Sequence, residues 1–202
     1  MNLKNFIGIL IPFLLFVGLC FYIIESFYLI TADQITYNKM ETELKMVREV
    51  MHLEYDNDLL TDAKEIIDEA FFSTNAPVNV YRARSGGTLV GLVFMPVRAK
   101  GYSGYIDLAI GLTNEGIITG VRVNKHQETE GFGSRIHQDN SNWIQGFEQR
   151  SLHNTPQKDW AVQSDGGNFD QISGATISPR GVINAVKKTL DYHEIYNEEL
   201  GE

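Results

Sequence analysis

The chain begins with an unbroken apolar run. Residues 6–24 (FIGILIPFLLFVGLCFYII) contain no charged side chain. At about 1.5 Å per residue, a helix of this length matches a bilayer hydrocarbon core of about 30 Å. The run is longer than the roughly 7–15 residues of a signal-peptide core, and no small-x-small cleavage site follows Glu25. The pattern therefore predicts an uncleaved membrane-spanning helix, with residues 6–30 as the anchor.

The charges beside this run predict its orientation. Lys4 and the free amino terminus lie on the short side of the run, and the positive-inside rule places them in the cytoplasm. We therefore expect residues 1–5 to be cytoplasmic and residues 31–202 to lie outside. In a bacterium with two membranes, the chain would be a single-pass protein of the inner membrane with a periplasmic C-terminal domain.

A helical spacing of apolar positions follows the anchor. Apolar residues recur at helical intervals over residues 33–55, from Ile35 to Met51. A polar break comes next, and residues 61–72 (TDAKEIIDEAFF) predict a second, shorter helix. Its acidic start suits the positive end of the helix dipole. We expect residues 31–75 to form a juxtamembrane helical segment.

From residue 78 the pattern changes to β-branched and aromatic residues separated by glycine. Residues 78–84 and 88–98 flank a Ser-Gly-Gly turn, and residues 105–113 and 117–124 flank an Asn-Glu-Gly turn. Two such runs joined by a short glycine-containing turn are typical of a β-hairpin. The sequence therefore predicts two consecutive hairpins.

The last third of the chain returns to helical spacing. Residues 134–149 predict a helix, and residues 160–163 predict a short strand. A final helix is expected to begin at Ser178, with a capping hydroxyl followed by Pro179 at the first helical position, and to run to about Tyr196.

Together these elements predict an α+β fold, an antiparallel sheet with packed helices over residues 76–202, preceded by one transmembrane helix. The net charge is −9, from 17 Lys and Arg against 26 Asp and Glu, and no basic run appears. Nucleic-acid binding is therefore not expected. Cys20 is the single cysteine and the histidines show no paired ligand spacing, so no disulfide, iron–sulfur cluster or other metal site is predicted.

The strongest local feature is the segment from Asp170 to Ser178 (DQISGATIS). It places small residues and hydroxyl groups just before a helix N-terminus, where free N–H groups and the helix dipole favour a phosphate. Any capped helix would supply something similar. The residues alone therefore leave two interpretations open. The segment is either a phosphate site or a turn in which the hydroxyl groups of Ser173 and Thr176 have no binding role.

Asp170 and the word Ser173-Gly-Ala-Thr176, followed by Ser178, resemble the flavinylation motif of the FMN-binding domain family. The resemblance implies that Thr176 carries FMN as a phosphoester, installed from FAD by a dedicated flavin transferase. It also assigns further cofactor-binding residues to the motif and to a glycine-containing loop before it, namely Ser173, Gly174, Ala175, Glu128, Thr129, Gly131 and Gly133.

Other segments follow one another as in the G subunit of Rnf-type electron transport complexes. They include residues 101–105 (GYSGY), residues 126–133 (HQETEGFG) and residues 160–170. Two departures stand out, because Glu130 and Phe132 occupy positions where the family usually has proline and leucine. Loss of the proline is expected to relax a turn that shapes the flavin pocket.

The resemblance implies a membrane-anchored flavoprotein that carries electrons on covalently bound FMN within an ion-translocating ferredoxin:NAD oxidoreductase complex. Its implied partners are the other subunits of a membrane redox complex, the flavin transferase and the membrane. Thr176 would be an attachment residue and not a catalyst. Three alternatives remain: a component like the C subunit of a sodium-pumping NADH:quinone oxidoreductase, a stand-alone extracytoplasmic FMN carrier, and a membrane-anchored scaffold domain without covalent flavin.

Overall fold

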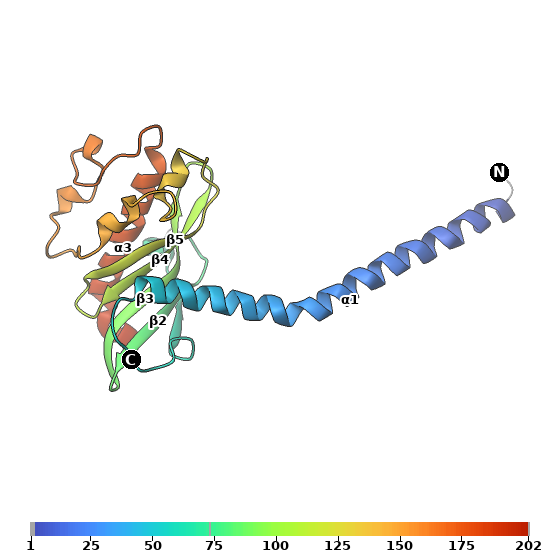
Figure 1. Cartoon of the computed structure of the whole chain (residues 1–202), viewed down its shortest axis with the longest axis horizontal. Helices are drawn as coiled ribbons and strands as arrows, with labels where there is room; N and C mark the ends of the chain where they lie inside the picture. The colour runs from blue at the N-terminus through green and yellow to red at the C-terminus, as the bar shows by residue number, and fades with distance from the viewer. Residues whose placement is uncertain (1–2, 73, 202) are drawn as a thin grey trace. The chain divides into compact units, whose positions relative to one another are not determined.

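The computed structural model describes residues 3–72 and 74–201, and the chain divides into two units, Met1–Glu43 and Leu44–Glu202 (Figure 1). The described residues of the first unit are all helical. The second unit holds a sheet together with the remaining helices.

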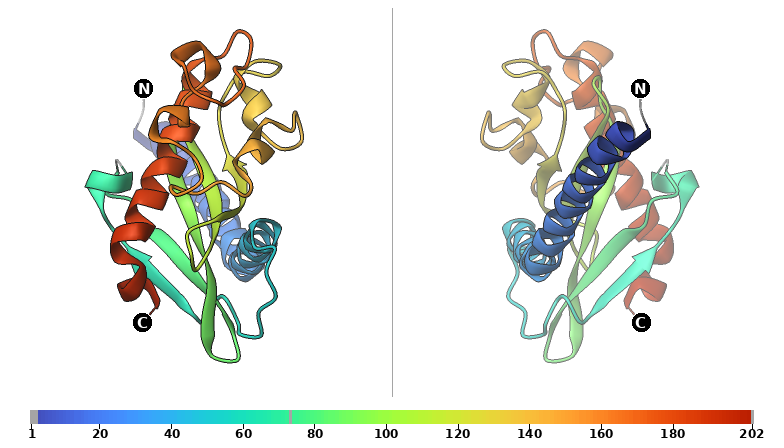
Figure 2. Two further views of the ribbon diagram at one scale, coloured as in Figure 1. Left: turned by 90° about the vertical axis from the view of Figure 1, so that its left-hand side faces the viewer. Right: turned by 90° about the vertical axis from the view of Figure 1, so that its right-hand side faces the viewer.

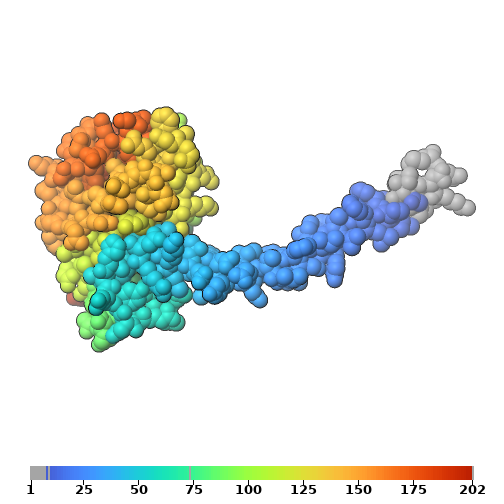
Figure 3. All heavy atoms as spheres, viewed as in Figure 1, coloured from blue at the N-terminus to red at the C-terminus, as the bar shows by residue number. Residues whose placement is uncertain are grey.

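Helix α1 (Leu3–Val50) begins in the first unit and ends in the second. Its apolar part is long and apolar enough to cross a membrane, and its side chains there are not buried in the protein (Figure 3). The sequence predicted a separate helix over residues 33–55, but α1 continues without a break to Val50. The reason is that residues 25–50 contain neither glycine nor proline, so nothing in the backbone stops the helix.

Five strands form one antiparallel sheet in the order in which they occur along the chain. They are β1 (Ala63–Ile66), β2 (Val78–Ser85), β3 (Thr88–Lys100), β4 (Tyr105–Thr113) and β5 (Ile118–Lys125). The two hairpins that the sequence predicted are confirmed as the β2–β3 and β4–β5 pairs. Their glycine-containing turns allow the sharp reversals that neighbouring antiparallel strands need.

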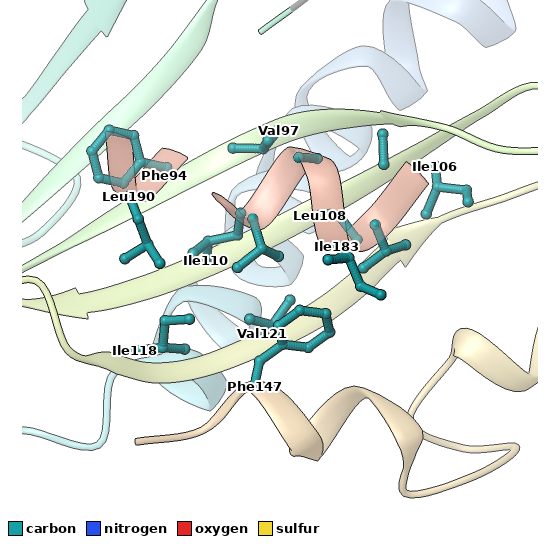
Figure 4. Packing of buried hydrophobic residues seen from close by; sticks show 14 of the residues in the cluster. Phe94, Val97, Ile106, Leu108, Ile110, Ile118, Val121, Phe147, Ile183 and Leu190 are labelled. Carbon is teal, nitrogen blue, oxygen red and sulfur yellow. The ribbon is translucent and has the colours of Figure 1, made fainter. Parts of the chain in front are cut away.

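Helices cover both faces of the sheet (Figure 2). On one face α3 (Ile177–Gly201) packs through its apolar stripe, and Figure 4 shows Ile183 and Leu190 of α3 beside Leu108 and Ile110 of β4. On the other face the last turns of α1 and the segment after it form a smaller cluster with β2, β3 and β4. Each fully buried side chain of this kind contributes about 1.5–3 kcal/mol, so the two clusters hold the sheet in place from both sides.

The helix predicted over residues 61–72 is wrong. The structure has strand β1 there, followed by the single turn of α2 (Glu69–Phe72). β1 pairs along the whole of its length with β2 and directs Ile66 into the core. Pairing satisfies the backbone groups that β2 would otherwise leave open at the sheet edge, and this tertiary contact outweighs the local helix preference.

Two further local predictions are also wrong. In place of one helix over residues 134–149, the structure has two short 3₁₀ helices, η1 (Gly133–Ile136) and η2 (Trp143–Phe147). Polar side chains interrupt the helix, because the Asn140 amide and the Ser141 hydroxyl donate to backbone carbonyls of η1. The strand expected at residues 160–163 is reduced to a single bridge between Val162 and Phe169.

Helix α3 was predicted at nearly its observed place. It begins at Ile177, one residue before the expected cap, and continues past Tyr196 to Gly201. Ser178 does not act as the N-cap, because it lies inside the helix and its hydroxyl donates to Glu128. The buried face of the helix contains Val182, Val186 and Leu190, as expected from the spacing.

Candidate functional site

The segment before α3 forms a tight turn. The N–H of Ala175 donates to the carbonyl of Ile172 over 3.0 Å, which closes a four-residue turn with Ser173 and Gly174 at its centre. Gly174 has φ +78°, a conformation that glycine adopts readily at the third position of such a turn. The turn delivers the chain directly to Thr176 and the first residue of α3.

Thr176 is exposed and lies next to the N-terminus of α3. Among the residues that the structure describes, its hydroxyl has no hydrogen-bond partner. Of the other two hydroxyl residues of the motif, only Ser178 differs from Thr176 in burial and in hydrogen bonding. Ser178 is buried and bonded to Glu128, while Ser173 is exposed at the turn.

Thr176 lines a hollow of about 330 Å³, which we call the Thr176 hollow. It is bounded by three segments: the 101–104 loop, the 128–133 loop and the start of α3 with the turn before it. Its lining consists of Tyr102, Glu128, Thr129, Phe132, Gly133, Gly174, Ala175, Thr176, Ile177 and Ser178. Apolar residues and the free hydroxyl residue Thr176 therefore line the same cavity.

Of the residues assigned to the cofactor site by resemblance, six line this hollow: Glu128, Thr129, Gly133, Gly174, Ala175 and Thr176. Ser173 and Gly131 are not part of its lining. The sequence reasoning did not assign the other four lining residues to the site: Tyr102, Phe132, Ile177 and Ser178. The hydrophobic character of Ile177 was a usable signal, because a large apolar side chain at the exposed start of a helix is out of place unless something covers it.

The 128–133 loop keeps its turn although the family's proline is absent. The carbonyl of Thr129 accepts from the N–H groups of Phe132 and Ser134, each over 3.2 Å. The N–H of Gly131, which has φ +76°, donates to the Ser134 hydroxyl over 3.0 Å. The absence of proline at position 130 was expected to relax this turn. Hydrogen bonds inside the loop keep the turn in place.

Among the described residues that line the Thr176 hollow, Glu128 is the only charged one, and it is 7% exposed. Its Oε1 accepts from the N–H of Ser103 over 3.0 Å, and its Oε2 accepts from the Ser178 hydroxyl over 2.5 Å. The backbone N–H of Glu128 donates to Nδ1 of His126 over 3.1 Å. One carboxylate thus joins the three segments that surround the hollow.

A second and larger hollow, of about 520 Å³, lies beside the same motif. Trp143 belongs to this hollow and not to that of Thr176. Its indole Nε1 donates to the carbonyl of Asp170 over 2.7 Å, and the side chain of Asp170 accepts from Gln163 over 2.9 Å. Trp143 therefore anchors the start of the motif from outside the Thr176 hollow.

An ion pair fastens the first turn of α3 to the loop before the motif. Arg180 donates to both carboxylate oxygens of Asp165 over 2.6 Å each. These hydrogen bonds from Arg180, together with its positive charge, hold the pKa of Asp165 below its usual value. Both groups are solvated, so the pair orients the helix start more than it stabilises the fold.

The comparisons with known proteins agree on one protein family. The family model for the FMN-binding domain matches residues 101–191. The chain is 37% identical to the G subunit of the ion-translocating oxidoreductase complex of Pseudoalteromonas atlantica over 174 residues, which cover 86% of this chain and 81% of that protein. It is 36% identical to the G subunit of the same complex of Vibrio cholerae serotype O1 over 173 residues, which cover 86% and 83%.

A solved structure is also similar. The crystal structure of Shewanella oneidensis NqrC matches with a TM-score of 0.49 and 20% identity, over 72% of this chain and 74% of that one.

Proposed function

We propose, from the premise that this chain belongs to the family of G subunits of ion-translocating oxidoreductase complexes, that it carries electrons on an FMN group joined covalently to Thr176. When bound, FMN supplies the redox chemistry, because its isoalloxazine ring takes up and releases electrons. The protein would tether that ring, orient it and tune its potential.

The free hydroxyl of Thr176, a residue that lines the Thr176 hollow, is the observation that supports this proposal. In the attachment reaction Thr176 Oγ1 forms a bond to the flavin-side phosphorus of FAD. The phosphoanhydride bond breaks, AMP leaves, and the hydroxyl proton passes to a base of the flavin transferase. Ser178 is buried and bonded, and Ser173 is exposed but lies outside the lining of the hollow.

The hollow and the helix start beside it suit the isoalloxazine ring and the phosphate of FMN, respectively. Phe132, Ile177 and Tyr102 are exposed apolar or aromatic side chains around it, and surfaces of this kind contact a planar aromatic ring well. The N-terminus of α3 lies directly after Thr176, where the helix dipole favours a phosphate. We therefore infer that the ring lies in the hollow and the phosphodiester at the helix start.

The proposal also includes an arrangement of the chain in the membrane. Residues 6–30 would span the inner membrane, residues 1–5 would be cytoplasmic, and the domain over residues 76–202 would lie in the periplasm. The working complex would pass electrons between ferredoxin and NAD and move ions across the membrane. A covalent tether has a physical reason there, because a dissociable flavin outside the cytoplasm would be lost by dilution.

The deciding experiment is coexpression of the full chain with a flavin transferase, followed by flavin fluorescence on a denaturing gel and intact-mass measurement. Thr176→Val keeps the shape of the side chain but removes the nucleophilic oxygen, so it should fold, insert and show no covalent flavin. Thr176→Ser should retain some flavin. Ser85→Ala, which removes an exposed hydroxyl outside the motif and the hollow, is the control and should be labelled like the unmodified chain.

Two results would contradict the proposal. Covalent flavin on the valine variant would move the attachment to another hydroxyl. Absence of flavin on the unmodified chain, with an active transferase present, would favour a scaffold domain without covalent flavin.

A further inference from the structure

Glu128 places a buried carboxyl group without an ion-pair partner among the described residues at the Thr176 hollow. Its side chain is nine-tenths buried, and among the described residues it forms no ion pair with a lysine, arginine or histidine. Its two oxygens instead accept one hydrogen bond each, from the Ser103 N–H and the Ser178 hydroxyl. Two accepted hydrogen bonds suit an ionised carboxylate, which is an acceptor only.

The backbone around Glu128 is shaped to admit this carboxylate. A side chain at Gly101 would overlap with Oε1, and one at Gly133 would overlap with Oε2. These glycines belong to different loops, the 101–104 loop and the 128–133 loop. The absence of their side chains therefore creates the space in which the charge is buried.

We propose that Glu128 is a positioning residue that locks the 101–104 loop and the start of α3 around the hollow, and that its fixed negative charge lowers the reduction potential of the flavin held there. The second half of this inference rests on the proposed function. Reduction adds negative charge to the flavin, and a nearby carboxylate opposes that change most strongly where protein excludes water. The hydrogen bonds from Ser103 and Ser178 stabilise the carboxylate without cancelling its charge.

Glu128→Gln removes the negative charge of the side chain and keeps its size and shape. The amide oxygen can still accept from the Ser103 N–H, and the amide nitrogen can donate to the Ser178 hydroxyl, so the loops stay joined while the charge disappears. Glu130→Gln is the matched control. It removes one negative charge two residues away, at an exposed position outside the lining of the hollow, where water and salt screen the effect.

The measurement is a spectroelectrochemical titration of the FMN-loaded full chain. At the midpoint potential of the unmodified protein, Glu128→Gln should raise the ratio of reduced to oxidised flavin about tenfold, which for a one-electron couple corresponds to about 59 mV. Glu130→Gln should leave the ratio within about twofold. An unchanged potential in Glu128→Gln, or an equal shift in both variants, would overturn the electrostatic role.

The positioning role is tested on the chain without FMN, so its outcome does not depend on the proposed function. Glu128→Ala leaves the Ser103 N–H and the Ser178 hydroxyl without their acceptor, and the melting temperature of the second unit should fall by about 5 °C. Glu128→Gln should lower it by less than half as much. Equal melting of all three proteins would overturn this role. Failure of Glu128→Gln alone to accept flavin, with normal melting, would make Glu128 a contact required for attachment and would also overturn the proposal.

Discussion

The ring of Phe132 lies in the space that a side chain at Gly174 would need. A Cβ atom built on Gly174 would come within 2.8 Å of Cδ1 and 3.1 Å of Cε1 of that ring. The two residues belong to different parts of the site, the 128–133 loop and the turn before Thr176. The loop and the turn therefore approach each other closely at this point of the site.

Gly174→Ala tests this contact. The substitution places a side chain at φ +78°, which costs about 1–2 kcal/mol for a residue other than glycine, and it also meets the Phe132 ring. We expect a fall in melting temperature of about 2–8 °C and a lower occupancy of covalent flavin by fluorescence. Phe132→Ala in the same chain should recover part of the loss, and a double-mutant cycle measures that coupling.

Gly146→Ala is the control for this substitution. Gly146 has no heavy atom within 4 Å of an added Cβ and no positive φ, so its melting temperature and flavin occupancy should remain close to those of the unmodified chain. If Gly174→Ala behaved like this control, the turn would not constrain the site.

Patterns in the sequence predicted the elements whose conformation depends on residues close to them in the chain. The hairpins were predictable because short glycine-containing turns separate apolar runs, and the buried stripe of α3 followed from its spacing. Strand β1 was not predictable from its own residues, since its conformation depends on pairing with β2 twelve or more residues away. The break between η1 and η2 was missed for a different reason: apolar spacing does not show that the side chains of Asn140 and Ser141 bind backbone carbonyls six residues earlier.

The candidate site was predictable as a set of residues but not as a geometry. Resemblance assigned Glu128 and Thr176 to one site, and both line the same hollow. No pattern in the sequence indicated that Glu128 accepts a hydrogen bond from Ser178, fifty residues further along the chain. Spacing alone could not place the carboxylate at the start of α3, since three separate segments have to converge for the contact to form.

Glu130→Pro should stabilise the 128–133 loop. Glu130 occupies the second position of a turn closed by the N–H of Phe132 and the carbonyl of Thr129, with Gly131 at φ +76° in the third position. Proline favours that second position, and no described hydrogen bond uses the Glu130 N–H. A gain of about 0.4–1 kcal/mol is expected from the restricted unfolded chain, or about 1–4 °C in melting temperature. A loss of stability would mean that the backbone at this turn does not suit proline.

His193 should make the second unit less stable in mild acid. It is 4% exposed, its Nε2 is buried without a hydrogen-bond partner among the described residues, and burial lowers its pKa against the opposing influence of Glu194 and Glu115. The unfolded chain binds a proton near pH 6.5 while the folded one resists it. Stability is therefore unaffected well above that pH and falls as the pH drops below it, by at most about 1.4 kcal/mol per pH unit.

Melting curves at pH 8 and pH 5.5 check this pH dependence. His193→Gln cannot take up the proton and should lose less stability between the two pH values than the unmodified chain. His153→Gln, at an exposed position near the same helix, is the matched control and should retain the full pH dependence. Identical behaviour of the two variants would assign the effect to other groups.

The orientation of the anchor can be tested with a single thiol. The chain has one cysteine, Cys20, inside the apolar run, and Cys20→Ser provides a background without thiols. In that background, Gln145→Cys places a thiol at an exposed position of the second unit, and Asn5→Cys places one in the segment expected to be cytoplasmic. If the positive-inside rule sets the orientation, a membrane-impermeant maleimide should label Gln145→Cys in intact spheroplasts and leave Asn5→Cys unlabelled until the membrane is opened. The reverse pattern would place the domain in the cytoplasm and remove the physical reason for a covalent flavin, because a cytoplasmic site could exchange with dissolved FMN.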